Sequence, residues 1–246
     1  MAGDRKRFVG TFHKTGTVLL ASVFRHLAHD LGLIFWQPRA VVWKTGRTAK
    51  PDFPWDICMD SQSRFLADAE LFTGDLRCVI SIRDPRDVVI SSARYHMTAP
   101  EKWLHRPDAA FGGATYQQAL NALATDHERY VFEMDHSSAQ TIAGMLAVDR
   151  GDPRIHIVQL DRLIVDAEFE EYRRMFEFLG FEGEALSVCL HAAQNRSALH
   201  RSDRPAHFHH EAPELWKRDF TPALAEAFEA RFPGAAQKLG YEPTLP

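Results

Sequence analysis

Short apolar runs alternate along the chain with longer segments in which apolar residues recur at helical spacing. The runs that read as buried strands cover residues 8–12, 57–59, 78–82 and 155–160. After the first run, apolar residues recur at helical spacing up to Gly32, which ends the predicted helix: Leu19, Leu20, Val23, Phe24, Leu27 and Leu31. Similar helical patterns begin at Val88 and at Phe169, the latter ending at Gly180. Strands alternating with helices predict the α/β class, with a central parallel sheet of about five strands flanked by helices on both faces.

The remaining segments predict loops and further helices within the same domain. Residues 37–54 and 100–113 mix Pro, Gly and basic residues with aromatic ones and show no clear period, which predicts two long functional loops. Residues 115–149 predict two helices. Because the sequence shows no internal repeat and no linker, we expect a single domain over residues 1–246.

Composition and charge restrict the kind of partner. The chain has 246 residues, 45% of them hydrophobic and 25% charged, with a formal net charge of -4. This balance argues against a protein that coats nucleic acid or an anionic membrane, so any anion site must come from a local group of positive charges. Cys58, Cys78 and Cys189 show neither metal-ligand spacing nor a disulfide framework. Without a signal peptide or an apolar span, a cytoplasmic location is expected.

A first anion-binding turn is predicted within RFVGTFHKTGTVLL, residues 7–20. In an ATP-binding loop, Gly-x-x-x-x-Gly-Lys-Ser/Thr, the lysine follows the second glycine, whereas here Lys14 precedes Gly16. A helix beginning near Thr17 would direct its free N–H groups and its positive dipole end at the turn. Gly16 would let the backbone approach an anion, Thr15 and Thr17 would add hydroxyl donors, and Lys14 a full charge. The alternative is an ordinary strand-to-helix turn with an exposed lysine.

A second strand-turn-helix segment is VISIRDPRDVVISSARYHM, residues 79–97. Arg83 stands at the strand end, Pro85 is placed to start a turn, and Ser91 follows on the helix. The planar fork of an arginine and a nearby hydroxyl suit a phosphate group. The alternative is a structural ion pair of Arg83 with Asp84 or Asp87. Two anion-binding turns on neighbouring strands predict one ligand that carries two phosphates at different ends.

These two segments resemble the signature segments of the PAPS-dependent sulfotransferases, PAPS being 3'-phosphoadenosine 5'-phosphosulfate. TFHKTGT is similar to the family's Pro-Lys-Ser-Gly-Thr-Thr segment. IRDPRDVVISS is similar to its Arg-Asn-Pro-Arg-Asp segment, whose serine follows the arginine by eight residues, as Ser91 follows Arg83. LDRLIVDAEFEEYRRMFEFLGF and ELWKRDFTPALAEAFEARFPGAAQKLGYE resemble later family segments, so the resemblance extends from about residue 7 to residue 242.

The resemblance implies a P-loop NTPase-like sulfotransferase fold and the transfer of a sulfuryl group from PAPS to a hydroxyl or amine, with PAP as product. The loop from Lys14 to Thr17 would hold the 5'-phosphosulfate, and Arg83 with Ser91 the 3'-phosphate. Lys14 would stabilise the negative charge that develops on the leaving oxygen. No metal would be required, because the transferred group carries one negative charge. The acceptor would be a small molecule or a saccharide. A homodimer is the one assembly considered, and the sequence does not decide the oligomeric state.

Several positions depart from the family's pattern. Leu19 stands where the family often has a Trp that stacks on adenine, and Gln159 replaces the Tyr of its Tyr-Glu-Asp segment. The family's late Arg-Lys-Gly would fall near His209, His210 and Glu211. These changes weaken the expected hold on adenine and leave both phosphate contacts in place.

The general base is open. The family's histidine or glutamate between the two phosphate segments would fall in WDICMDSQSRF, which contains no histidine. Asp60 is the first candidate, and its alternative is a surface or helix-capping role before Ser61. His13, next to Lys14, is the second candidate.

Three groups of residues suggest how an acceptor and the nucleotide would be enclosed. Aromatic residues of the expected loops could line an acceptor pocket, although most aromatic side chains belong to cores: Phe35, Trp36, Trp43, Phe53, Trp55, Tyr95 and Trp103. Lys44, Arg47 and Lys50 would suit an anionic or sugar-like acceptor. The tract HFHH at residues 207–210, with His200 nearby, favours a loop closing over the 3'-phosphate more than a metal site.

Two other functions compete with sulfuryl transfer. A P-loop nucleotide or small-molecule kinase would carry the order Gly-Lys-Ser/Thr, which is absent. A catalytically inactive, sulfotransferase-like nucleotide-binding protein is favoured by the replaced adenine contacts and the open question of the base. It would bind nucleotide without turnover.

Overall fold

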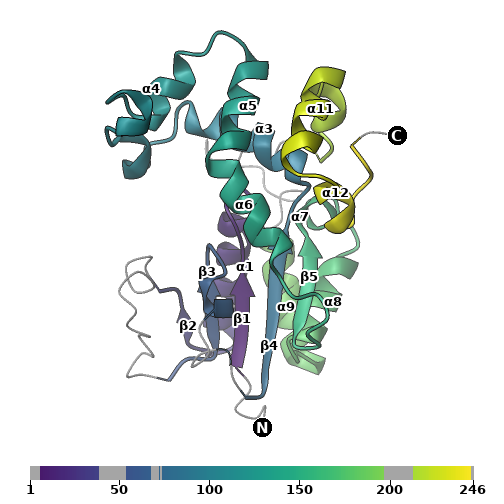
Figure 1. Ribbon diagram of the computed structural model, residues 1–246. Coiled ribbons are helices and arrows are strands. Elements are labelled where there is room, and N and C mark those ends of the chain that lie inside the picture. Colours follow the sequence, from purple (N-terminus) through teal and green to yellow (C-terminus); the bar gives the residue numbers. More distant parts are fainter. Residues whose placement is uncertain (1–5, 39–53, 68–71, 73, 197–212, 245–246) are drawn as a thin grey trace. The chain divides into compact units, whose positions relative to one another are not determined.

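Five strands form one all-parallel sheet in the part of the chain that the computed structural model describes, residues 6–38, 54–67, 72, 74–196 and 213–244. Their order across the sheet is β2-β3-β1-β4-β5 (Figure 1). The strands are β1 (Lys6–Gly10), β2 (Phe35–Trp36), β3 (Ile57–Asp60), β4 (Leu76–Ile82) and β5 (Ile155–Gln159). The predicted α/β class and parallel sheet are confirmed.

Four of these strands overlap the predicted apolar runs, and β2 has no counterpart among them. β2 has two residues and pairs only with β3, at the edge of the sheet, so it leaves no periodic signal in the sequence. Its residues, Phe35 and Trp36, are among the aromatic residues expected to line an acceptor pocket. Trp36 packs against Trp55, which is 5% exposed, with 5.5 Å between the ring centroids. Trp36 therefore takes part in packing at the sheet edge, and a role of these residues in an acceptor pocket stays a prediction.

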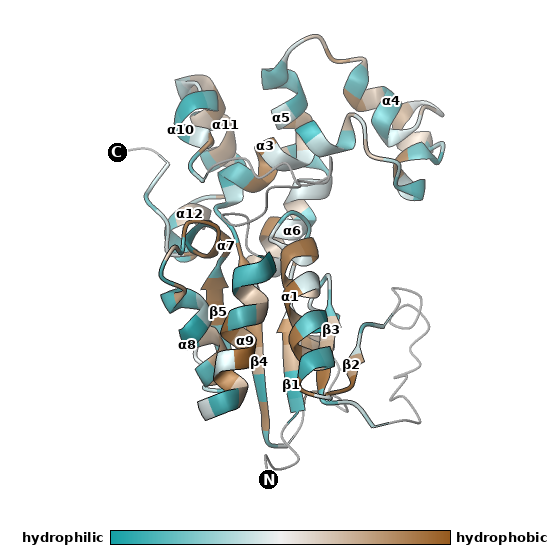
Figure 2. Cartoon of the chain, turned by 180° about the vertical axis from the view of Figure 1, so that it is seen from behind, coloured by the Kyte–Doolittle hydropathy of each residue, from teal (hydrophilic) through white to brown (hydrophobic). Residues whose placement is uncertain are grey.

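The two faces of β1 contact different partners. Val9 belongs to a buried core shared with α1 (Thr17–Asp30) and α9 (Gly183–Arg196). Its neighbour Phe8 packs against Trp55, with 5.2 Å between the ring centroids. Because successive strand residues point to opposite faces, α1 and α9 cover one face of the sheet and an aromatic cluster covers part of the other. Figure 2 shows both helices in front of the strands.

The described residues divide by their contacts into two compact units. Those within residues 1–82 and 148–210 form the first unit, which contains the whole sheet. Those within residues 83–147 and 211–246 form the second. The single domain expected over residues 1–246 stays a prediction, because a compact unit need not fold on its own. The three cysteines, Cys58, Cys78 and Cys189, are buried and free of disulfide bonds, as expected.

The second unit consists of helices, and the first unit contains helices in addition to the sheet. Where two helices are predicted over residues 115–149 the chain forms three: capping boxes at Thr115 and Thr125 begin the first two, and the third begins after His136 without a side-chain cap. The expected loop at residues 100–113 contains two short 3-10 helices, Lys102–His105 and Ala109–Phe111. The first unit adds α7 (Leu160–Leu163) and α8 (Glu170–Phe178). The second contains α3 (Pro85–His96), α4 (Tyr116–Asn121), α5 (Asp126–Asp135), α6 (Ser137–Leu146), α10 (Trp216–Asp219), α11 (Pro222–Arg231) and α12 (Ala235–Lys238).

Among the helices of the described residues, none combines the length and the apolar character that a membrane crossing requires.

Candidate functional site

The loop between β1 and α1 is held in an unusual backbone conformation. Lys14 has φ 62° and Gly16 has φ 94°, both in the left-handed region. For a lysine this conformation costs about 1–2 kcal/mol, so the surrounding contacts must impose it. The hydroxyl of Thr15 supplies two of them: it accepts the N–H of Phe12 at 2.7 Å and donates to the Phe12 carbonyl at 3.1 Å. Specific hydrogen bonds within the loop therefore support its backbone conformation.

The same loop is fastened to the sheet. Ser81, near the carboxyl end of β4, donates its hydroxyl to the Thr15 carbonyl at 2.7 Å. β1 and β4 are hydrogen-bonded neighbours, as the hypothesis of two turns on neighbouring strands requires. The hydroxyl of Thr17 lies 2.7 Å from that of Thr11. In this state the Thr15 and Thr17 hydroxyls, expected as ligand donors, hold the loop together, and the backbone N–H groups and Lys14 carry the positive potential.

The N-terminus of α1 faces this loop without a side-chain cap. Gly16 is the N-cap residue and offers no side-chain acceptor to the first N–H groups of the helix. The first turn of this 14-residue helix contains no acidic residue. Exposed N–H groups and the positive dipole end make such a terminus suited to an anion. The lysine beside it adds a full positive charge to the same loop.

Gly16 is also required by packing. A Cβ at this position would lie 2.7 Å from Cδ1 of Leu160, a buried residue just beyond β5. Gly32, after the other end of α1, has φ 65°, and a Cβ added there would have nothing within 4 Å. An alanine at Gly32 would therefore meet only the cost of the backbone conformation, whereas an alanine at Gly16 would also meet the cost of the contact with Leu160.

Gly16→Ala is expected to destabilise the protein more than Gly32→Ala does. Gly32→Ala should lower the free energy of unfolding by about 1–2 kcal/mol, the cost of a left-handed conformation for a residue with a Cβ. Gly16→Ala adds overpacking against Leu160, typically about 1–3 kcal/mol more. Urea unfolding of both variants measures the difference. Equal destabilisation would contradict the close packing of Gly16 on Leu160.

Asp60 ends β3, opposite Gly10 of β1 in the sheet register. Its carboxylate is buried, accepts the N–H of Arg64 at 2.6 Å, and lies 3.6 Å from the Arg64 guanidinium. Burial raises the pKa of Asp60, while hydrogen bonds from the following turn and the Arg64 charge oppose the rise. A raised pKa suits a general base, and the contact with the Arg64 N–H is the capping role named as the alternative. His13, the second candidate, lies partly buried in the turn before Lys14.

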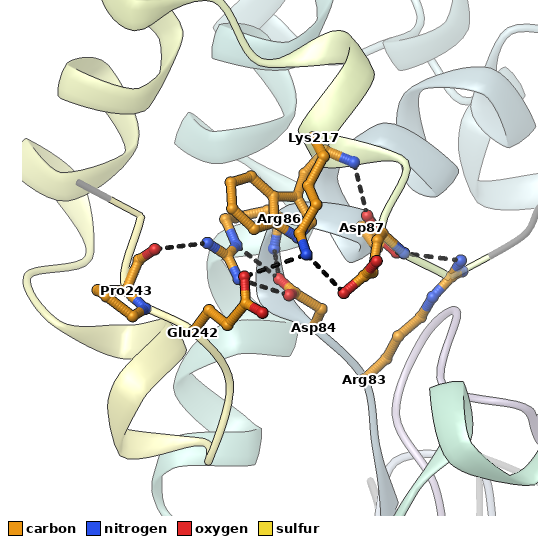
Figure 3. A network of polar contacts seen from close by, with 9 residues as sticks. Arg83, Asp84, Arg86, Asp87, Lys217, Glu242 and Pro243 are labelled. Carbon is orange, nitrogen blue, oxygen red and sulfur yellow. Dashed lines mark hydrogen bonds and ion pairs between the residues drawn. The ribbon is translucent and has the colours of Figure 1, made fainter. Parts of the chain in front are cut away.

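Arg83 lies between the end of β4 and the N-cap of α3, Ser91 lies on the second turn of α3, and both are 5% exposed. Asp84 caps the helix and pairs with the Arg86 guanidinium through two contacts, at 2.9 Å and 2.6 Å (Figure 3). Arg83 lies 3.9 Å from Asp87, at the outer limit of an ion pair. The ion pair with Asp87 that is the alternative role of Arg83 is thus present, and it is a long one.

A buried polar network that the sequence does not predict joins the start of α3 to the C-terminal segment. Asp87 accepts the backbone N–H of Glu214 at 2.9 Å and that of Trp216 at 3.0 Å. The Arg86 guanidinium lies 3.4 Å from the centroid of the Trp216 ring and donates to the carbonyl of Pro243 at 3.3 Å. These partners are more than 120 residues apart in sequence, beyond the reach of any local pattern. The only local signal is the pairing of opposite charges in RDPRD.

The structure also describes some of the other expected residues, and the rest lie outside the described residues. Leu19, in place of the family's stacking Trp, is 3% exposed and belongs to the core. Gln159 ends β5. Tyr95 and Trp103 both donate to the carboxylate of Glu101, at 2.8 Å and 2.5 Å. Outside the described residues lie Trp43, Lys44, Arg47, Lys50, Phe53, His200, the tract 207–210 with His209 and His210, and Glu211.

Within the described residues, no group of three or more His, Cys, Asp and Glu side chains is arranged to hold a metal ion.

Comparison with known proteins adds a family and a fold. A family model of the sulfotransferase domain matches residues 63–240, a span that includes Arg83 and Ser91 and begins after the Lys14 loop. The structure is similar to that of mouse sulfotransferase SULT7A1 complexed with PAP, with a TM-score of 0.62 and 15% identity over 96% of this chain and 87% of that chain. It is also similar to the sulfotransferase domain of the Synechococcus PCC 7002 olefin synthase, with a TM-score of 0.54 and 15% identity over 99% and 96%. No curated protein matches the sequence.

Proposed function

The chain belongs to the sulfotransferase family, and we propose that it transfers a sulfuryl group from PAPS to a hydroxyl or amine of a small-molecule or saccharide acceptor. The observation that carries this proposal is the loop between β1 and α1. It places a lysine in a strained left-handed conformation at the uncapped N-terminus of a 14-residue helix. The presence of PAP in the structure of the similar mouse SULT7A1 supports the choice of donor.

The proposed reaction is an in-line displacement at sulfur. The acceptor oxygen or nitrogen forms a bond to sulfur while the bond from sulfur to the 5'-phosphate oxygen breaks, and PAP leaves with that electron pair. The acceptor's proton passes to a base, for which Asp60 is proposed first and His13 second. Lys14 and the N–H groups at the start of α1 stabilise the negative charge that grows on the leaving oxygen. The residues proposed to bind the donor carry the needed charge without a metal ion.

The proposed reaction is tested by PAP release from PAPS in the presence of EDTA. The acceptors offered would be a phenol, an aliphatic alcohol, an aryl amine and a set of mono- and oligosaccharides. Acceptor-dependent PAP release with a matching sulfated product is the expected result. PAP binding without release on any acceptor class would favour the catalytically inactive nucleotide-binding protein.

Arg83→Ala is expected to weaken binding of PAP far more than binding of AMP, because only PAP carries a 3'-phosphate. A charge-assisted hydrogen bond contributes about 1.5–3 kcal/mol, which corresponds to a roughly 10- to 150-fold loss of PAP affinity. Ser91→Ala removes a neutral donor and should cost about 0.5–1.5 kcal/mol. Calorimetric titration of each variant with both nucleotides measures the two losses. An equal loss of affinity for PAP and AMP would refute the assignment of Arg83 to the 3'-phosphate.

A further inference from the structure

Asp87 is shared between the residue proposed to bind the 3'-phosphate and a turn of the C-terminal segment. Its side chain is fully buried on the first turn of α3. Figure 3 shows Asp87 near Arg83. One carboxylate oxygen of Asp87 accepts the N–H of Glu214, the other accepts the N–H of Trp216, and Arg83 lies 3.9 Å from the first of them. A buried carboxylate requires such partners, because an uncompensated charge in the interior is costly.

The turn that Asp87 holds is itself strained. Glu214 has φ 67°, a left-handed conformation that residues with side chains rarely adopt. Contacts on both sides hold it there: Asp87 accepts its N–H, and the Lys217 ammonium lies 2.7 Å from its carboxylate. The Trp216 ring that follows is stacked on the Arg86 guanidinium. A strained turn of this kind is sensitive to the strength of the hydrogen bonds that hold it.

We propose that Asp87 is a positioning residue that couples occupation of Arg83 by a phosphate to the docking of the Glu214–Trp216 turn. When a phosphate engages the Arg83 guanidinium, the positive charge that partly balances Asp87 is directed to the ligand. Asp87 then depends more strongly on the N–H groups of Glu214 and Trp216, and these hydrogen bonds tighten. By thermodynamic reciprocity, docking of the turn favours phosphate binding to the same extent. The inference rests on the proposed role of Arg83.

Hydrogen exchange of the full chain tests the coupling. At saturating concentrations, PAP should slow exchange in a peptide covering residues 213–220 by about fivefold or more relative to AMP, the lower end of typical coupling between sites. Arg83→Ala, still saturated with PAP, should lose this difference. Lys217→Ala is the matched control on the same turn, because it removes the contact with the Glu214 side chain and leaves both hydrogen bonds to Asp87. It should retain the slowing.

Asp87→Asn distinguishes coupling through Asp87 from direct contact between nucleotide and turn. The amide has one acceptor oxygen, so one of the two backbone hydrogen bonds is lost and the PAP-dependent slowing should largely disappear. Full retention of the slowing in this variant would overturn the proposal. If Asp87→Asn does not fold, the wild-type chain and Arg83→Ala still test the coupling. It is overturned if PAP does not slow exchange in the wild type, or if the slowing is fully retained in Arg83→Ala.

The two proposals can fail separately. PAP binding that is tighter than AMP binding and depends on Arg83, together with unchanged exchange at residues 213–220, would refute the coupling and leave the proposed role of Arg83 intact. Calorimetry in which Arg83→Ala weakens PAP and AMP equally would refute that role, and the coupling with it.

Discussion

Lys14→Met is expected to reduce the turnover number by about 10²–10³-fold, the usual effect of removing one donor that stabilises a developing oxyanion. The reason is that the charge on the leaving oxygen grows as the bond to sulfur breaks, so the lysine contributes mostly in the transition state. The proposed role of Lys14 rests on its position in the loop at the uncapped start of α1. The measurement is acceptor-dependent PAP release at saturating PAPS.

The binding of PAP separates this role from simple anion binding. If Lys14 acts mainly in the transition state, Lys14→Met should weaken PAP binding by less than about tenfold while turnover falls by two to three orders of magnitude. Lys238→Met is the control, since Lys238 is an exposed lysine whose ammonium contacts a backbone carbonyl of its own segment. A variant of Lys14 that loses PAP affinity and keeps its turnover number would contradict the assignment.

Asp84→Ala should be among the most destabilising single substitutions, at about 3–5 kcal/mol, because it leaves the guanidinium of Arg86 buried without its carboxylate. Both side chains are buried, 0% exposed for Arg86 and 5% for Asp84, and their closest contact is 2.6 Å. The carboxylate also caps α3 by accepting the Arg86 N–H at 3.0 Å. Chemical denaturation measures the change in the free energy of unfolding.

The chain contains a matched control for this prediction. Asp152, Pro153 and Arg154 repeat the tripeptide Asp-Pro-Arg, and the pair makes the same contacts, with Nε and Nη2 of Arg154 at 3.0 Å and 2.6 Å from the carboxylate. This second pair is more exposed, 36% for Arg154 and 14% for Asp152. Asp152→Ala should therefore destabilise the protein far less, because solvent can replace the lost partner. Similar losses of stability at both sites would show that burial of the Arg86 guanidinium does not set the cost of removing its carboxylate.

The alternation of apolar runs and helical periods predicts the sheet, because buried parallel strands and amphipathic helices leave distinct local patterns. β2 leaves none, since two residues at a sheet edge have no period to detect. The number of helices between residues 115 and 149 escapes the periodic pattern because the helices are separated by short breaks, one at the Thr125 capping box and one at His136. Local sequence patterns therefore predict the sheet and its helices better than they predict short edge strands and the breaks between helices.

The candidate site shows the same limit. The turns around Lys14 and Arg83 are local and could be predicted from their residues. The partners of Asp87 and Arg86 could not, because Glu214, Trp216 and Pro243 approach α3 only in the folded chain. The hydrogen bonds of the Thr15 hydroxyl to the backbone of Phe12 are local, but they could not be predicted either, because the same residue order would serve a ligand equally well.

The family assignment supports the two halves of the proposed donor site unequally. The matched span, residues 63–240, contains Arg83 and Ser91 and does not reach Lys14. Structural neighbours at 15% identity establish the fold, which places a loop and a helix N-terminus after β1. The assignment of Lys14 therefore depends on the geometry of its own loop.

The proposal that the chain binds a 3',5'-bisphosphate nucleotide is tested most directly by calorimetric titration with PAP, AMP and ATP, each with EDTA and with Mg²⁺. We expect PAP binding that is unchanged by EDTA and roughly tenfold or more tighter than AMP binding, the least that one charge-assisted contact to the 3'-phosphate should contribute. ATP binding that requires Mg²⁺, without a preference for PAP, would contradict it and favour a kinase.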